Sequence, residues 1–254
     1  MNPDVLKVKE LLQIWGETFA NECRKNPGKG KYHKADPVRK SEMHWALGGL
    51  QPDECRVFLK VYRAKPEIVS FNRNGSFTMK GKRNRGKGPY HILGRNDDHI
   101  TNFAEYLIHI GAFGELVLDY GWLLDDVIFE KGEFDILGHG NTEKSMERDI
   151  LLVEAKARVS DGDDSLESLR DSLINKAADP TYEITKPNHL RKWNELVSRL
   201  NSGPVYLWLV ASGARWSYLV RKNGSHVRMK HLNSPPYYKN VLVQTQDNAK
   251  SIKF

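Results

Sequence analysis

Hydrophobic positions in residues 1–95 predict a mainly helical region. An amphipathic helix over residues 3–25 is indicated by apolar side chains that recur at intervals of three and four: Val5, Val8, Leu12, Trp15 and Phe19. The Asn26-Pro27-Gly28 segment ends this helix. The pattern then predicts short helices over residues 41–47 and 52–64. A hairpin over residues 68–79 follows, with Asn74-Gly75 in its turn.

The middle of the chain predicts one long helix followed by three strands. The helix begins at capping residues 96–98, and an apolar stripe continues to Gly121, where it ends. A strand over 121–129 then turns at Lys131-Gly132 into a second strand over 133–137, which carries Asp135. A third strand follows a polar loop and ends at Glu154-Ala155-Lys156.

The last part of the chain alternates helices and strands. A capping box formed by Asp164 and Glu167 begins one helix, and a second is predicted over 185–200, with Leu190, Trp193 and Val197 inward and Lys192 outward. A buried strand over 205–210 is followed by a hairpin over 215–232, and residues 240–244 could add an edge strand. The sequence therefore predicts an α/β fold with a mixed central sheet flanked by helices.

Two charged residues interrupt the apolar third strand. Side chains alternate along a strand, so Glu154 and Lys156 share a face with Ile150 and Leu152, while Leu151, Val153 and Ala155 point the other way. Both faces are therefore largely apolar. Burying a carboxylate and an ammonium there costs several kcal/mol unless each finds a partner.

A divalent metal site explains these charges. Asp135 and Glu154 offer hard oxygen ligands for Mg²⁺, with Mn²⁺ as a second candidate, and one or two carboxylates plus a substrate phosphate are the usual Mg²⁺ ligands. Lys156 lies two residues along the same face, where it could orient the attacking water and neutralise charge on a phosphate.

Asp135 followed by Glu154-Ala155-Lys156 on the next strand resembles the hallmark of the PD-(D/E)XK superfamily, also called restriction-endonuclease-like nucleases. The resemblance covers residues 98–220. Phe134 stands where the family motif has Pro, a common departure. The resemblance implies a restriction-endonuclease-like core with Asp135, Glu154 and Lys156 as catalytic residues, and with Asp135 and Glu154 as the metal ligands.

In this family, a helix before the hairpin often contributes a further Glu to the site. Two residues compete for that role here, Glu105 near the helix start and Glu115 ten residues later. We favour Glu105, because its position leaves most of the helix free to pack on the sheet. Surface exposure of both side chains is the alternative.

Charge is segregated along the chain. The net charge is +11 for residues 1–95, −14 for 96–185 and +10 for 186–254. Basic flanks around an acidic metal-binding centre suit an enzyme that acts on nucleic acid, because phosphate contacts supply most of the affinity. An unevenly charged, solvated surface is the alternative.

Two clusters of cations are predicted to contact nucleic acid. One is a flexible basic loop, with Lys80, Lys82, Arg83, Arg85 and Lys87; the other is the face of the 52–64 helix, with Arg56, Lys60 and Arg63. The helices and hairpin of residues 1–95 could form a winged helix. The loop could equally be a linker, and we place a domain boundary near residue 95, with a basic domain over 1–95 and a nuclease domain over 96–254.

Other features bear on the compartment. No stretch is apolar enough to span a membrane, the charged N-terminus is unlike a signal peptide, and Cys23 and Cys55 form no metal or disulfide pattern. The expectation is a cytoplasmic protein.

The sequence thus predicts a Mg²⁺-dependent phosphodiesterase, most simply a DNA endonuclease of restriction, defence or repair type. DNA is favoured over RNA as the partner, and a homodimer is possible. One alternative is a nucleic-acid-binding protein with an inactive nuclease-like core. Another is a structural protein in which Glu154 and Lys156 pair with each other or with neighbours.

Overall fold

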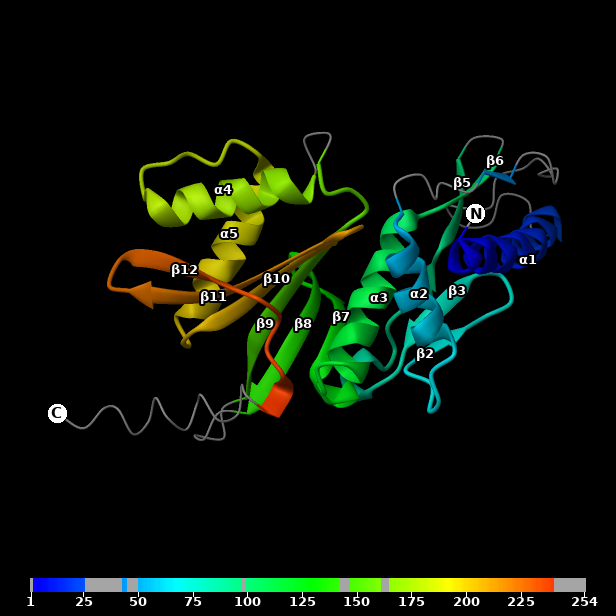
Figure 1. Ribbon diagram of the computed structural model, residues 1–254, viewed down its shortest axis with the longest axis horizontal. Coiled ribbons are helices and arrows are strands. Elements are labelled where there is room, and N and C mark those ends of the chain that lie inside the picture. The colour runs from blue at the N-terminus through cyan, green and yellow to red at the C-terminus, as the bar shows by residue number, and fades with distance from the viewer. Residues whose placement is uncertain are drawn as a thin grey trace.

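The computed structural model describes residues 2–25, 43–44, 50–96, 99–141, 147–160 and 165–239. A six-stranded sheet forms the centre of this α/β fold (Figure 1). Its strands are β7 (Val127–Lys131), β8 (Phe134–Asn141), β9 (Glu147–Lys156), β10 (Val205–Ala211), β11 (Ala214–Asn223) and β12 (His226–Leu232). Their order across the sheet is β12-β11-β10-β9-β8-β7. The mixed sheet flanked by helices was correctly predicted.

The central strand β9 is antiparallel to β8 and parallel to β10. Lys156 at the end of β9 lies opposite Ala211 at the end of β10. All seven residues of β10 are buried, which is expected for a strand covered by helices on both faces. The remaining pairs are hairpins, and Gly224 takes a positive φ in the turn between β11 and β12.

Helices cover both faces of this sheet. Helix α3 (Ala104–Leu118) packs on one face, in a core cluster that includes Val153 and Ala155 of β9. Helices α4 (Leu166–Ala178) and α5 (Pro187–Leu200) cover the other face, in a second cluster that includes Leu152 and Leu207. The two layers separate clearly in Figure 1.

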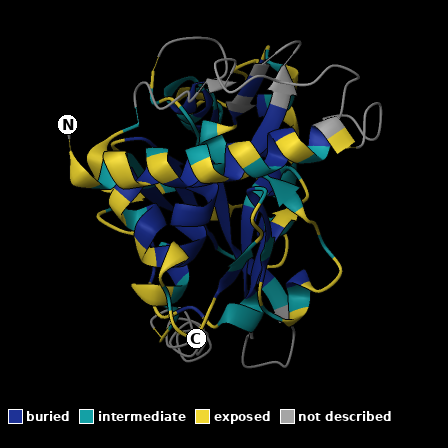
Figure 2. Cartoon of the chain, turned by 90° about the vertical axis from the view of Figure 1, so that its right-hand side faces the viewer, coloured by how far each residue is buried: buried dark blue, intermediate teal, exposed yellow. Residues whose placement is uncertain are grey.

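The N-terminal part packs against α3. Helix α1 (Pro3–Lys25) exposes one side and buries the other (Figure 2), while α2 (Pro52–Tyr62) packs along α3. A small sheet contains β2 (Val69–Phe71), β3 (Ser76–Met79) and β4 (Tyr90–His91). The first core cluster runs without interruption from Val8 to Val210, so apolar packing crosses the boundary predicted near residue 95. The division into two domains stays a prediction.

Several predicted elements differ from the observed ones. Met43–His44 form strand β1, which pairs with β6 (His99–Asn102), so the helix predicted over 41–47 is wrong at these residues. The long helix begins only at Ala104, because residues 93–102 form a hairpin of β5 (Leu93–Asn96) and β6. The β-branched Ile100 and Thr101 suit strand pairing better than a first helical turn.

Further differences concern the hairpin before β9. Residues 121–126 are not a strand; Leu124–Asp126 form a 3₁₀ turn, and β7 begins at Val127. Ser165, rather than Asp164, caps α4 by accepting a hydrogen bond from the Ser168 amide at 3.3 Å. Asp164 itself and the edge strand predicted over 240–244 lie outside the described residues.

A β-bulge changes the face of one predicted side chain. Gly138 pairs with Leu151 but His139 pairs with Asp149, so Ile150 is the extra residue in β9. Ile150 therefore joins the cluster on the α3 side instead of sharing a face with Glu154 and Leu152. Strict alternation cannot anticipate an inserted residue.

The basic loop after β3 is ordered and packed. Lys82–Asn84 form a 3₁₀ turn, and the buried Asn84 side chain donates to Val127 O at 2.8 Å and accepts from the Phe129 amide at 2.9 Å. The prediction of a flexible loop is therefore wrong. Hydrogen bonds to Val127 and Phe129 attach this segment to β7.

Across the described ranges, we find no helix that combines the length and apolar character needed to cross a membrane.

Candidate active site

The four residues predicted to form a catalytic centre converge at one end of the central sheet. Glu105 comes from the first turn of α3, Asp135 from the start of β8, and Glu154 and Lys156 from the end of β9. Glu105, Asp135 and Lys156 line a surface pocket of about 260 Å³ together with other residues. The remaining lining residues are Phe103, Tyr106, His109 and Glu130.

Asp135 is held in place by the backbone of the neighbouring strand. Its Oδ2 accepts a hydrogen bond from the Ala155 amide at 2.7 Å and lies 3.5 Å from Nε2 of His109. The amide belongs to the residue between Glu154 and Lys156, so the sheet itself sets the position of this carboxylate relative to both.

Glu154 lies fully buried between two lysines. Its Oε1 is 3.2 Å from Lys156 Nζ, and its Oε2 accepts a hydrogen bond from Lys192 Nζ at 2.6 Å. Burial, and then the charge of Asp135, raise the pKa of Glu154 to about 8 against the opposing effect of both lysines. With a pKa of about 8 this carboxyl group is mostly protonated at neutral pH, so further positive charge beside it would be needed to ionise it.

Lys192 is a site residue that the sequence prediction placed on the wrong side of its helix. The buried residues of α5 are His189, Lys192, Trp193, Leu196 and Leu200, whereas Leu190 is exposed. The true inner face is rotated by about one residue from the predicted one. A stripe drawn through Lys192, Leu196 and Leu200 has the same helical spacing, so the signal was present but the charge argued against it.

Lys156 also contacts the helix carboxylate. Its Nζ lies 3.3 Å from Oε1 of Glu105, so one ammonium joins α3 to the end of β9. Burial alone would raise the pKa of Glu105, but interactions with His109 and then Lys156 lower it to about 2. Glu105 is therefore ionised throughout the physiological range.

His109 and Glu130 are two further residues that the sequence prediction missed. His109 lies one helical turn after Glu105; its Nε2 is 3.1 Å from Ala155 O, and its Nδ1 is 3.3 Å from Glu130 Oε1. Nδ1 is buried and makes no hydrogen bond of acceptable geometry. The spacing of four from Glu105 was the signal in the sequence.

The surroundings of these two residues are unusual. Burial would lower the pKa of His109, but the carboxylates of Asp135, Glu105 and Glu130 raise it well above its usual value. Glu130 has a φ of 50°, a left-handed conformation that non-glycine residues rarely adopt and that is often found at functional sites. Ligand atoms of His109, Glu130 and Asp135 all lie within 4.8 Å of one another.

Glu115 lies in a different network. Its carboxylate is 3.1 Å from Arg215 Nη2, and the same guanidinium pairs with Glu54 of α2 at 2.8 Å. Arg215 thus joins α2, α3 and the start of β11. Of the two helix carboxylates considered for the site, Glu105 therefore lies beside Lys156 and Glu115 does not, while the role of Glu105 stays a prediction.

Comparison with family models, with curated proteins and with solved structures yields no match. Function therefore has to be argued from the geometry.

Five of the eight cations predicted to bind nucleic acid have partners within the protein. Arg56 pairs with Asp53 at 3.0 Å, Lys60 with Asp119, and Lys82 with Asp125 at 3.3 Å. Lys87 Nζ donates to Phe129 O at 3.2 Å, and burial lowers its pKa. Arg83 also has contacts within the protein, whereas Arg63, Lys80 and Arg85 form no ion pair with the residues that the structure describes.

The donor set at the pocket fits a divalent cation. The first sign is the orphaned imidazole Nδ1 of His109 facing a carboxylate. The second is that burial and the charge of Asp135 raise the pKa of Glu154, an effect that a cation beside both carboxyl groups would offset. Asp135 belongs both to the group with His109 and Glu130 and to the pair with Glu154. A cation bound by either set of residues would therefore contact Asp135.

Proposed function

We propose that this protein is a metal-dependent nuclease that hydrolyses phosphodiester bonds, with DNA as its substrate. The single observation that supports it is the meeting of Glu105, Asp135 and Lys156 from three separate elements at one small pocket, with the buried Glu154 3.2 Å from the Lys156 ammonium. Carboxylates beside an ammonium are the groups that metal-assisted phosphoryl hydrolysis requires.

Asp135 and Glu154 would hold the cation, Mg²⁺ or Mn²⁺, and His109 and Glu130 offer further ligand atoms within 4.8 Å of a carboxylate oxygen of Asp135. Bound there, the cation supplies a Lewis acid that polarises a phosphoryl oxygen and lowers the pKa of water.

Three further charged residues each have a definite role in this proposal. Lys156 presents its ammonium in the pocket wall, where it can orient a water molecule and offset negative charge on the phosphate. Glu105 of α3 positions Lys156 through the 3.3 Å ion pair. Lys192 positions Glu154 through its 2.6 Å hydrogen bond and favours the ionised form of this carboxylate, although Lys192 lies outside the pocket.

The test is cleavage of supercoiled, linear and single-stranded DNA, with RNA alongside, in Mg²⁺ or Mn²⁺. Asp135→Asn and Lys156→Ala should each reduce the rate by at least about 100-fold, a typical effect of removing one group that stabilises the transition state. Glu183→Gln and Lys65→Ala change exposed residues far from the pocket lining and serve as charge-matched controls. Undiminished cleavage in both site variants would reject the proposal.

One observation favours a second candidate, a nucleic-acid-binding protein with an inactive core. Both oxygens of Glu154 already face ammonium groups, and Glu154 does not line the pocket, so its charge is compensated without a cation. In this case the protein would bind DNA yet show no turnover with any divalent metal. Calorimetric titration with Mn²⁺ separates the two, because only the nuclease should lose metal affinity in Asp135→Asn.

A further inference from the structure

The β11–β12 hairpin lies in a stretch of sequence without acidic residues. Between Glu195 and Asp247 the chain has no Asp or Glu, but it has seven Lys or Arg residues. A solvated surface of an ordinary protein mixes both signs of charge. The composition alone therefore points to a surface that meets a polyanion.

The structure shows which of these cations remain without a counter-charge. Arg199 pairs with Asp149 and Glu195, and Arg215 with Glu54 and Glu115, so acids from other elements neutralise both. By contrast, the hairpin residues Arg221, Arg228 and Lys230 are exposed and form no ion pair with any part of the chain that the structure describes. We call these three residues the basic hairpin face.

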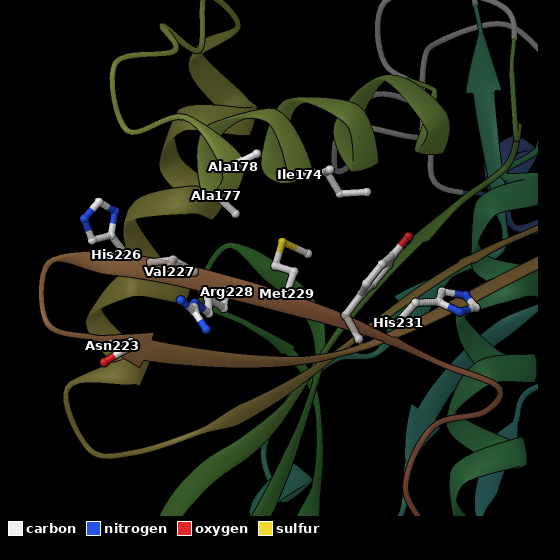
Figure 3. A pocket seen from close by; sticks show the side chains of 10 residues that line it. Ile174, Ala177, Ala178, Asn223, His226, Val227, Arg228, Met229 and His231 are labelled. Atoms are coloured by element: carbon white, nitrogen blue, oxygen red, sulfur yellow. The ribbon is translucent and has the colours of Figure 1, made fainter.

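Strand register brings these three cations together. Arg221 lies directly opposite Arg228, and Lys230 lies opposite Leu219, two residues along the same face. Val227 and Met229 alternate with them and pack toward α4, on the side seen in Figure 3. A hollow of about 550 Å³ is lined by Arg221, Arg228 and Lys230 together with Leu219.

Protection of the sheet edge is the other explanation for charge at this place. In the described sheet β12 is an edge strand, and lysines on such strands prevent pairing with other chains. Edge protection does not require a cation on the inner strand β11, however. Two like charges directly opposite each other also destabilise a hairpin, which a bound anion would reverse.

We propose that the basic hairpin face binds the phosphate backbone of the DNA that the candidate active site acts on; this inference rests on the proposed function. The face lies at the far end of β11 from Ala211 and Lys156. Arg221 lies seven residues along β11 from Ala214, a span of about 23 Å, so a duplex that reaches both places must extend over about seven base pairs. The hairpin thus acts as a second anchor, distant from the reacting phosphate.

The experiment measures binding of a short fluorescein-labelled DNA duplex by anisotropy over a range of salt concentrations, with EDTA present. The variant carries Arg221→Gln, Arg228→Gln and Lys230→Gln. Loss of three phosphate contacts should lower the magnitude of the slope of log K against log salt by about 3 and weaken binding at least about tenfold. Circular dichroism melting checks that the exposed hairpin still folds.

A matched control removes the same charge elsewhere. Lys7, Lys65 and Arg191 are exposed and pair with Glu10, Glu67 and Glu133, and their replacement by Gln should leave the salt slope nearly unchanged. Equal losses in both triple variants, or tight binding to phosphatidylserine vesicles but not to DNA, would overturn the inference. Because EDTA prevents turnover, a failure of cleavage does not affect this result.

Discussion

At the scale of single residues, Glu154 shows how an ionisable group is kept inside an apolar core. Two lysines from different elements flank its carboxylate, and Lys192 also donates to the backbone oxygen of Glu133. Removing one partner of a buried pair costs more than the pair itself contributes, because the remaining charge stays buried. The stability of this end of the sheet therefore depends on a cluster of charges.

A pH dependence of stability follows from the raised pKa of Glu154. The folded protein holds this proton more tightly than the unfolded chain, whose pKa is 4.5, against about 8 in the fold. The resulting stability is fully present below pH 4.5 and is lost as the pH rises to about 8. Compared with a Glu154→Gln variant, the free energy of unfolding should therefore fall by a few kcal/mol across this window.

Urea denaturation of both proteins at a series of pH values measures this difference. Glu183→Gln removes an exposed carboxylate and reports the effect of charge alone. A difference that stays constant from acid to weakly alkaline pH would contradict a proton on Glu154 in the folded state.

At the scale of elements, the contact between α2 and α3 depends on small residues. Gly111 and Gly114 of α3 face Val57 and Val61 of α2, so the two helices approach closely there. A Cβ on Gly114 would clash with a methyl of Val61, whereas one on Gly111 would lie 3.3 Å from a methyl of Val57. The same change should therefore have different effects at two positions one turn apart.

Gly114→Ala should destabilise the protein by about 1–3 kcal/mol through overpacking, although alanine favours helix. Gly111→Ala is the matched control; it should destabilise the protein less than Gly114→Ala does, or even stabilise it. Val61→Ala in the Gly114→Ala background should recover part of the loss, as measured by thermal unfolding. Equal stability of the two single variants would show that the helices can move apart freely.

The contrast between predicted and observed elements has physical causes. The helices and strands from β7 to β10 could be predicted, because their hydrophobic patterns extend over many residues and glycine marks their turns. Local pattern could not reveal the bulge at Ile150 or the inward Lys192, since both depend on what packs opposite. His109 and Glu130 escaped prediction for the same reason, because strands distant in sequence bring Glu130 beside α3.

At the scale of the whole molecule, the N-terminal part and the central sheet share polar as well as apolar contacts. The Gln51 amide donates to Ser212 Oγ at 2.8 Å, and Arg215 pairs with Glu54. These bonds join residues about 160 positions apart, at the edge of the same interface that α2 makes with α3. The stability of the N-terminal part and that of the central sheet therefore depend on each other.

Expression of residues 96–254 alone tests this dependence. The fragment would expose the apolar face of α3 that α2 covers and would leave Arg215 with one carboxylate, Glu115, in place of two. We expect it to lack a cooperative urea transition and near-ultraviolet circular dichroism, whereas the full chain should unfold in one step by both probes. A cooperative transition of the fragment at the same midpoint would instead support two independent domains, because α2 would then contribute nothing to the packing of α3.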